Sequence, residues 1–206
     1  MKNIFVSSEI LIDNHKQKKV LVSTDLINYF QSLNINLNYG FSLNNKIINK
    51  IVSSNKGLIL SGTGDINKLK INKTNLLRDK FEKKLITKFI YKKKPILCIC
   101  RGFQLYASIN KGKFSKSNRH VRKFHNLEID KNSKFIKYEN LKVNSYHNYT
   151  ITSIDGKKIN VISITKDGSI EIAEGKDSKI LCIMFHPERK NVSQIKINKI
   201  IRSFFK

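Results

Sequence analysis

Short apolar runs alternate with amphipathic segments in the first half of the chain. Three of these runs predict buried strands, at residues 4–6, 57–60 and 95–99. After the strands, apolar residues recur every three or four positions, which predicts helices at three places: from a cap at Thr24 or Asp25 to Leu33, over 78–91 and over 102–109. Strands that alternate with helices favour a mainly parallel sheet with helices on both faces.

The second half has a different pattern, in which short strands are separated by turn signals. Turns are indicated at Asp155-Gly156 and Asp167-Gly168, and the apolar runs predict strands at 127–129, 149–154, 161–165 and 170–173. A last buried strand is predicted over 180–185 and a closing helix over 193–205. The expected fold is α/β, a mostly parallel sheet flanked by helices with antiparallel additions. Because no repeat or linker divides the chain, we expect a single domain over residues 1–206.

Length and apolar content are enough for a folded core. The chain has 206 residues, of which 40% are hydrophobic, so disorder is not expected. No apolar run approaches the roughly 18–20 residues that cross a bilayer, and the first residues lack a signal-peptide core. The three cysteines are an odd number and make no disulfide framework. These features predict a soluble cytoplasmic protein that has no membrane partner.

The charge is strongly basic, with 40 Lys and Arg against 15 Asp and Glu and a formal net charge of +25. Such a balance is typical of proteins that bind nucleic acid or anionic membranes. Only six of the basic residues are Arg, however, the residue that recognises phosphate with two parallel hydrogen bonds. The excess of Lys, Asn and Ile instead indicates a compositional bias, so we expect no specific nucleic-acid partner.

The stretch from Ile96 to Gln104 carries the clearest chemical signal. A buried strand that ends on Cys100, with small Cys98 two positions before it and Gly102 two positions after it, is typical of a strand–turn–helix elbow. In such a turn the helix N-terminus points its free N–H groups at the thiol, which favours the nucleophilic thiolate. Taken alone, both cysteines also fit ordinary core residues. Their Cys-x-Cys spacing, without a second pair, does not predict a metal site.

A second strand end supplies the groups that a cysteine nucleophile needs. The apolar run from Ile180 delivers His186 to its end, Pro187 fixes the turn, and Glu188 is placed to hold the other imidazole nitrogen. Cysteine, histidine and carboxylate together form the general-base arrangement of covalent hydrolases. A lone histidine at a strand end is more often a packing or surface residue, so the argument rests on the two segments together.

Five segments match motifs of a known family. They are Leu60–Ile66, Arg78–Glu82, which we expect at a helix start, Ile99–Gln104, Val143–His147 and His186–Glu188. In this combination the chain resembles the class I glutamine amidotransferase-like proteins, and within them the γ-glutamyl hydrolase branch. The resemblance covers residues 58 to 188 and implies a three-layer, flavodoxin-like sandwich.

The resemblance also implies roles for individual residues. Cys100 would be the nucleophile, His186 would carry protons, and Glu188 would orient His186. Backbone N–H groups of Thr63, in the Gly62-Thr63 turn, and of Arg101 would hold the oxyanion. The residues expected to bind the glutamyl group are Gly62, Gln104, Asn144, Ser145, Tyr146 and His147. Neither a cofactor nor a metal is implied.

Two positions depart from the family pattern. Cys98 stands where relatives have the glycine two residues before the nucleophile, so the turn would be shifted or the second thiol would be a redox partner. Thr63 replaces the second glycine of the oxyanion loop, and it would be strained if the position needs a positive φ.

A basic segment offers contacts for a leaving group. Arg119, His120 and Arg122 would form a cationic rim suited to a phosphate-bearing leaving group, next to Lys123 and His125. The alternative is a solvated basic loop that reflects the general excess of Lys.

Three functions follow from these patterns. The leading hypothesis is a hydrolase that releases glutamate from a small γ-glutamyl amide, and one such subclass acts on γ-glutamyl-CDP-amidate in surface-polysaccharide modification. The second is a glutaminase subunit that supplies ammonia to a separate synthetase. The third is an inactive basic binding module on the same fold, which the Cys100, His186 and Glu188 set argues against.

Overall fold

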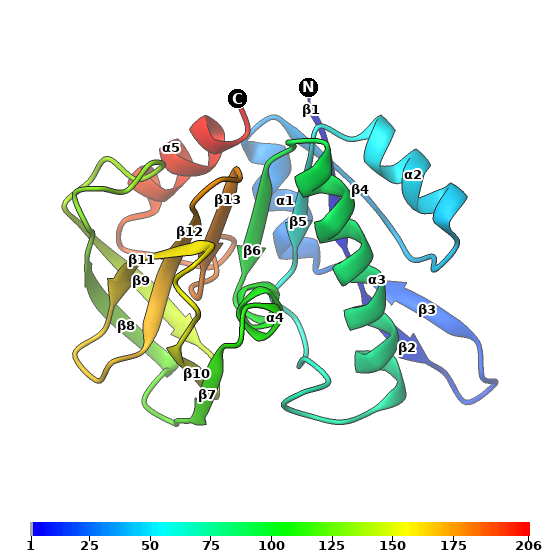
Figure 1. Cartoon of the computed structure of the whole chain (residues 1–206), viewed down its shortest axis with the longest axis horizontal. Helices are drawn as coiled ribbons and strands as arrows, with labels where there is room; N and C mark the ends of the chain where they lie inside the picture. Colours follow the sequence, from blue (N-terminus) through cyan, green and yellow to red (C-terminus); the bar gives the residue numbers. More distant parts are fainter. Residues whose placement is uncertain (1) are drawn as a thin grey trace.

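A seven-stranded sheet forms the centre of the computed structural model, which describes residues 2–206 (Figure 1). Its strands lie in the order β11 (Ile159–Ile164), β12 (Ile170–Gly175), β13 (Ile180–Ile183), β6 (Ile96–Ile99), β5 (Gly57–Leu60), β1 (Lys2–Ser7) and β4 (Ile35–Gly40). The five strands from β13 to β4 are parallel, and β12 and β11 add to one edge in antiparallel pairing. The predicted fold class, including its antiparallel additions, is therefore confirmed.

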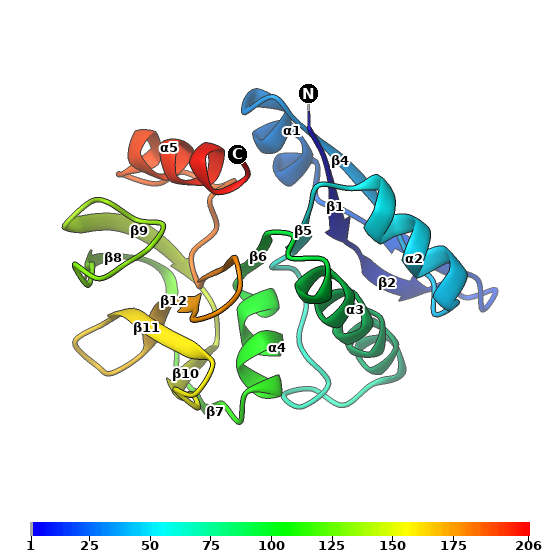
Figure 2. The ribbon, with the colours of Figure 1, turned by 45° about the horizontal axis from the view of Figure 1, so that its top comes forward.

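Helices cover both faces of this sheet (Figure 2). On one face, α1 (Thr24–Ser32) and α5 (Gln194–Phe204) pack Phe30 and Phe204 against strand residues such as Ile59. The other face is covered by α2 (Asn45–Ser54), α3 (Lys73–Tyr91) and α4 (Arg101–Ile109). Strands β5, β6 and β13 are buried along their whole length, because helices cover them on both sides.

Three two-stranded antiparallel sheets extend the sandwich. They are β2 (Glu9–Ile12) with β3 (Lys18–Leu21), β7 (Lys113–Lys116) with β10 (Tyr149–Ser153), and β8 (Val121–Glu128) with β9 (Asn140–Tyr146). The β8–β9 pair contributes Leu127, Leu141 and Val143 to the same core as α5. In the part of the chain that the structure describes, no helix is both long and apolar enough to cross a membrane.

Several boundaries differ from the sequence predictions. The first helix is capped at Ser23, whose side chain makes no capping hydrogen bond, and not at Thr24 or Asp25. Helix α3 begins at Lys73, where the Asn72 side chain accepts a hydrogen bond from the Asn75 N–H, so Arg78–Glu82 lies inside the helix and not at its start. The segments β2, β3, β4, α2, β7 and β9 were not predicted as elements.

Candidate active site

The Cys100 turn lies where β6 passes into α4, at the carboxyl edge of the parallel strands. Cys100 has φ 45° and ψ −100°, a conformation that non-glycine residues rarely adopt and that is held only when the surroundings enforce it. Its N–H donates to the Ile183 carbonyl at 2.7 Å, and its carbonyl accepts from the Gln104 N–H at 2.9 Å. The thiol therefore stands at the N-terminus of α4, where unpaired N–H groups favour a negative charge.

Two glycines allow this turn to approach its neighbours. A Cβ on Gly102 would lie 2.4 Å from the Leu60 carbonyl oxygen, so only glycine lets α4 start so close to β5. A Cβ on Gly62 would lie 2.6 Å from His186 Cε1 and 3.2 Å from Cys100 Cβ. Gly62 is thus in contact with both the thiol-bearing and the imidazole-bearing residue.

His186 follows β13, the strand that pairs with β6, and is buried. Its Nδ1 lies 2.7 Å from Glu188 Oε1. Burial lowers the pKa of His186, but the Cys100 thiolate and the Glu188 carboxylate act more strongly in the opposite direction and raise that pKa to about 10. A cysteine beside an imidazole whose pKa is raised can combine a nucleophile with a proton donor.

Asn144 holds the backbone of His186 from both sides. Its Nδ2 donates to the His186 carbonyl at 2.8 Å, and its Oδ1 accepts from the His186 N–H at 2.9 Å. The side chain is buried and does not line the cavity beside Cys100. The predicted substrate contact of Asn144 is therefore corrected, because both ends of its amide are used to position His186.

A cavity of about 360 Å³ opens next to Cys100 and His186. Of the predicted substrate-binding residues, it is lined by Gly62, Gln104, Tyr146 and His147. Its full lining is Glu9, Gly62, Thr63, Gly64, Asp65, Cys100, Gln104, Tyr146, His147, Asn148, Tyr149, His186 and Arg189. Ser145 does not belong to this set, since it is buried and its Oγ donates to the His120 carbonyl at 2.7 Å.

The loop after β5 is free of the strain that the sequence suggested. The left-handed residue is Gly64, with φ 76°, and Thr63 is not among the positive-φ residues. The Arg78 side chain holds this loop: Nη1 donates to the Thr63 carbonyl at 2.7 Å, and Nη2 donates to Ser61 Oγ at 2.9 Å. The carbonyls of the loop are thereby turned toward α3.

Arg78 belongs to a buried ion network that links three segments. Its Nε donates to Glu82 Oε1 at 2.9 Å, and Arg101 pairs with both Glu82 and Asp79. Asp79 also accepts from the Asn67 N–H at 2.9 Å. The network fixes the start of α4 and the loop after β5 against α3, a role that the sequence motif alone did not indicate.

Cys98 lies in a different core from Cys100. It is fully buried on β6 beside Cys182 of β13, on the sheet face that α3 and α4 cover, whereas Cys100 belongs to the core on the other face. All three cysteines are free thiols, and burial raises the pKa of Cys182. The idea that Cys98 is a redox partner of Cys100 is therefore wrong in this geometry.

The predicted cationic rim is also corrected. His120 is 1% exposed and its Nε2 is 2.9 Å from Asp167 Oδ2, while Arg119 and Arg122 are both exposed and do not line the cavity. The segment after His120 is strand β8 and not a solvated loop. The side chain of His120 therefore turns into the protein and does not belong to a rim around Cys100.

Three charged lining residues, Glu9, Asp65 and Arg189, were not predicted as site residues from the sequence. Arg189, directly after the His-Pro-Glu motif, places its guanidinium 4.4 Å from the centre of the Tyr146 ring. Among the described residues it is the one Lys or Arg that lines the cavity, and Glu9 stands in the same lining from the start of β2. The position of Arg189 beside the motif was a usable signal, whereas nothing near Glu9 in the sequence marked it.

Comparisons with known proteins agree with this architecture. The family model described as Peptidase C26 matches residues 12–188. The γ-glutamyl-CDP-amidate hydrolase of Campylobacter jejuni subsp. jejuni serotype O:2 is 32% identical over 171 residues, which are 83% of this chain and 78% of that protein.

Two solved structures share the fold at low identity. One is a Thermoplasma acidophilum protein named for a GMP synthase subunit, with TM-score 0.74 and 18% identity over 100% of this chain and 92% of its own. The other is a glutamine amidotransferase of Thermotoga maritima, with TM-score 0.70 and 13% identity over 98% and 96%. On the family match and the C. jejuni relative, the chain belongs to the Peptidase C26 family of class I glutamine amidotransferase-like proteins and is an amide-bond hydrolase.

Proposed function

We propose that the protein hydrolyses a γ-glutamyl amide through a thioester on Cys100. The observation that carries this proposal is the cavity in which a strained Cys100, at a helix N-terminus, meets a buried His186 paired with Glu188. The relative from C. jejuni acts on a γ-glutamyl compound by its name, which supports the same acyl group here.

The first half-reaction forms the acyl-enzyme. The Cys100 thiolate attacks the γ-carbonyl carbon, a C–S bond forms, and negative charge moves to the carbonyl oxygen. His186 then gives its proton to the leaving nitrogen as the C–N bond breaks, so the amine leaves neutral. Glu188 holds the imidazole at Nδ1, which leaves Nε2 for this proton.

Water completes the reaction. With the amine gone, neutral His186 takes a proton from water, whose oxygen attacks the thioester carbon. The C–S bond breaks, and glutamate and the Cys100 thiolate are released. In both halves the oxyanion would be held by the backbone N–H groups of Arg101 and Thr63, and each such donor is worth roughly 10²–10³ in rate.

The charges of the cavity suit a glutamyl group and an anionic leaving group. Glu9 and Asp65 offer carboxylates to the α-amino group, while Arg189 offers a cation to a carboxylate or a phosphate. We therefore propose a γ-glutamyl-CDP-amidate, the compound in the relative's name, as the first substrate to try.

The experiment measures glutamate release from γ-glutamyl-CDP-amidate and from glutamine. We expect Cys100→Ala to abolish release, and Cys182→Ala, which removes another buried thiol, to retain it. Release by the Cys100→Ala protein would rule out the thioester mechanism.

The same assay tests the alternative of a glutaminase subunit. Hydrolysis of γ-glutamyl-CDP-amidate by the isolated protein, with a kcat/KM far above that for glutamine, supports the leading proposal. Glutamine hydrolysis that requires an added synthetase would support the alternative instead, in line with the synthase subunit that shares the fold.

A further inference from the structure

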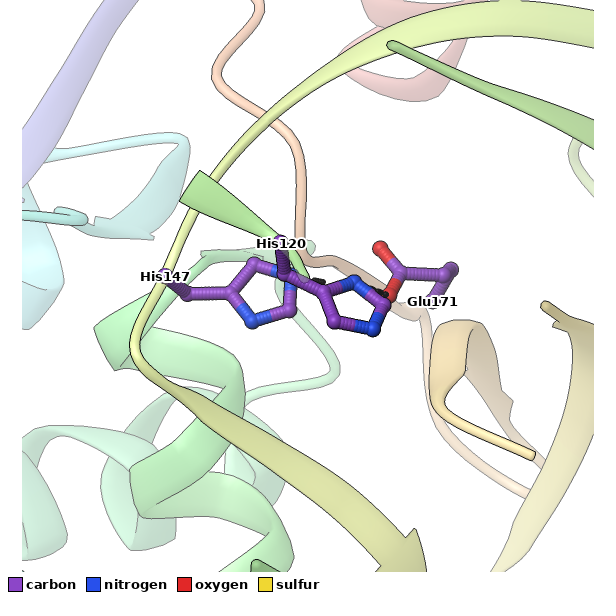
Figure 3. A group of neighbouring side chains, drawn as sticks. All are labelled: His120, His147 and Glu171. Carbon is purple, nitrogen blue, oxygen red and sulfur yellow. Dashed lines mark ion pairs between the residues drawn. The ribbon is translucent and has the colours of Figure 1, made fainter. Parts of the chain in front are cut away.

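Two histidines and a glutamate, His120, His147 and Glu171, lie close together (Figure 3). They come from three separate segments: His120 directly precedes β8, His147 lies between β9 and β10, and Glu171 is on β12. The exposed fraction of each of the three side chains is at most 1%. The proposed hydrolysis makes no use of this cluster.

The two nitrogens and the carboxylate oxygen that could bind a metal ion face one another. His120 Nδ1 lies 3.4 Å and His147 Nε2 lies 3.5 Å from the same oxygen, Glu171 Oε1, and the three atoms are within 4.8 Å of one another. The Ser169 hydroxyl also donates to Glu171 Oε1, at 2.9 Å. Among the residues that the structure describes, neither nitrogen has a hydrogen-bond partner, and Glu171 Oε2 has none. Buried polar atoms are rarely left in this state.

The outer contacts fix the tautomer of each ring. His120 Nε2 lies 2.9 Å from Asp167 Oδ2 and His147 Nδ1 lies 3.1 Å from the Tyr149 carbonyl, so each of these nitrogens carries the proton. The inward nitrogens, His120 Nδ1 and His147 Nε2, then present lone pairs toward a carboxylate. Lone pairs that face one another with no proton between them repel, and a cation placed among them removes the repulsion.

We propose that His120, His147 and Glu171 bind a divalent transition-metal ion, with Zn²⁺ as the best match. In a tetrahedral site with bonds of about 2.0–2.1 Å, neighbouring ligand atoms lie about 3.3 Å apart, close to the two separations observed. Imidazole nitrogens held at their other N–H by a carboxylate or a carbonyl are typical of metal ligands. Water would complete the coordination.

The site would act as a structural tie. It would join β8, the β9–β10 connection and β12, and His147 and its neighbour Tyr146 line the cavity. Bound metal would therefore hold this wall in place, while the bond-making steps remain at Cys100.

The alternative to a metal ion is a second proton on the His120 ring, which would make it an imidazolium. Burial lowers the pKa of His120, but the Glu171 and Asp167 carboxylates together raise it by more, so an imidazolium would also relieve the repulsion. The two accounts differ in one measurable respect, because only the first predicts stoichiometric metal.

The test uses the Cys100→Ala protein, so that the reactive thiol cannot capture metal. It is stripped with a chelator and titrated with Co²⁺, then with Zn²⁺. We expect one Co²⁺ per chain, visible d–d bands of a four-coordinate ion without a thiolate charge-transfer band, and displacement of Co²⁺ by one equivalent of Zn²⁺. Thiolate charge-transfer bands, or no stoichiometric binding, would overturn the proposal.

Variants locate the site. Glu171→Gln and His120→Gln should weaken Co²⁺ binding at least 100-fold, and Asp167→Asn, which changes the outer contact, should weaken it about 10–100-fold. His15→Gln, at an exposed histidine, should bind like the parent. Unchanged binding by folded Glu171→Gln and His120→Gln would place the metal elsewhere and contradict the assignment. The absorption spectrum of the parent decides the question if those variants do not fold.

Discussion

At the scale of single residues, the proton on His186 links the site to the stability of the fold. The Cys100 thiolate and Glu188 raise the pKa of His186 to about 10, above the roughly 6.5 of a histidine in an unfolded chain. The stabilisation that the His186 proton gives the folded state is therefore complete below about pH 6.5, and it is lost as the pH rises toward 10.

We expect the free energy of unfolding to fall between pH 9 and pH 10 by up to about 1.4 kcal/mol more in the wild type than in Cys100→Ala. Without the thiolate, His186 loses its main charged neighbour and titrates at lower pH. Urea denaturation at both pH values measures the difference. Parallel pH dependences of the two proteins would show that no thiolate–imidazolium pair is present.

Arg189 gives a second prediction at this scale. Its guanidinium lines the cavity and stacks on Tyr146, so Arg189→Ala should remove a charge-assisted contact to a phosphate. A loss of about 1.5–3 kcal/mol corresponds to roughly a 10- to 160-fold lower kcat/KM for γ-glutamyl-CDP-amidate. Glutamine hydrolysis should change less. The matched control is Arg119→Ala, at an exposed arginine outside the cavity. Equal effects of the two substitutions would contradict the proposed contact between Arg189 and the leaving group.

Some of the site could be predicted from sequence because it rests on local motifs. Cys100, His186 and Glu188 follow strand ends, and strand ends can be read from apolar runs. The inward turn of His120 could not be predicted, because Asp167 lies 47 residues away and meets it only after β8 and β12 have folded. For the same reason Asn144 was assigned to the substrate and not to the His186 backbone.

At the scale of elements, the contact between α4 and β5 sets the position of Cys100, the proposed nucleophile. Gly102→Ala would place a Cβ 2.4 Å from the Leu60 carbonyl oxygen, a backbone atom that cannot rotate away. We expect a loss of at least about 2 kcal/mol in the free energy of unfolding, and a lower kcat because Cys100 must shift. Gly156→Ala, which meets nothing within 4 Å, is the control for urea denaturation. Equal stability of the two variants would contradict the close approach.

The contact between α3 and the loop after β5 leads to a prediction about rate. Arg78 reaches Glu82, Ser61 and the Thr63 carbonyl at once, and the single ammonium of lysine cannot replace this fork. Arg78→Lys should lower kcat about tenfold or more with little change in KM, because the loop that carries a proposed oxyanion donor is loosened. Lys80→Met, on an exposed position of the same helix, should leave both constants unchanged. A rise in KM alone would assign Arg78 to substrate binding.

The strands that the sequence predicted most accurately are those with continuous apolar runs. Strands β5, β6 and β13 are buried at every position, and their ranges were close to those observed. Strand β3 is exposed throughout, so it carries no apolar pattern among its lysines. Helix α2 does carry one, because Ile47, Ile48, Ile51 and Val52 recur at helical spacing, and that signal was missed. The structure of β3 depends on its pairing with β2, which no local window contains.

At the scale of the whole molecule, one sheet draws strands from both ends of the chain. It contains β1, which starts at Lys2, and β13, which ends at Ile183, and the Lys2 ammonium donates to the Phe205 carbonyl at 2.9 Å. This arrangement supports our proposal that residues 1–206 form one domain. The carboxyl ends of β5, β6 and β13 then meet at one edge, where the proposed chemistry takes place.

The net charge of +25 gives the last prediction. The buried charged groups are more acidic than basic, which leaves the surface even more basic than the total; they are Asp79, Glu82, Glu171 and Glu174 against Arg78 and Arg101. Like charges on a surface repel and destabilise the compact state, and salt shortens their range from about 10 Å at 0.1 M to about 3 Å at 1 M. The urea midpoint should therefore rise between 0.1 M and 1 M KCl. A Lys157→Gln and Lys158→Gln double variant, at two exposed positions, should gain less from the same salt step, whereas an equal gain would show that the salt acts through something other than surface repulsion.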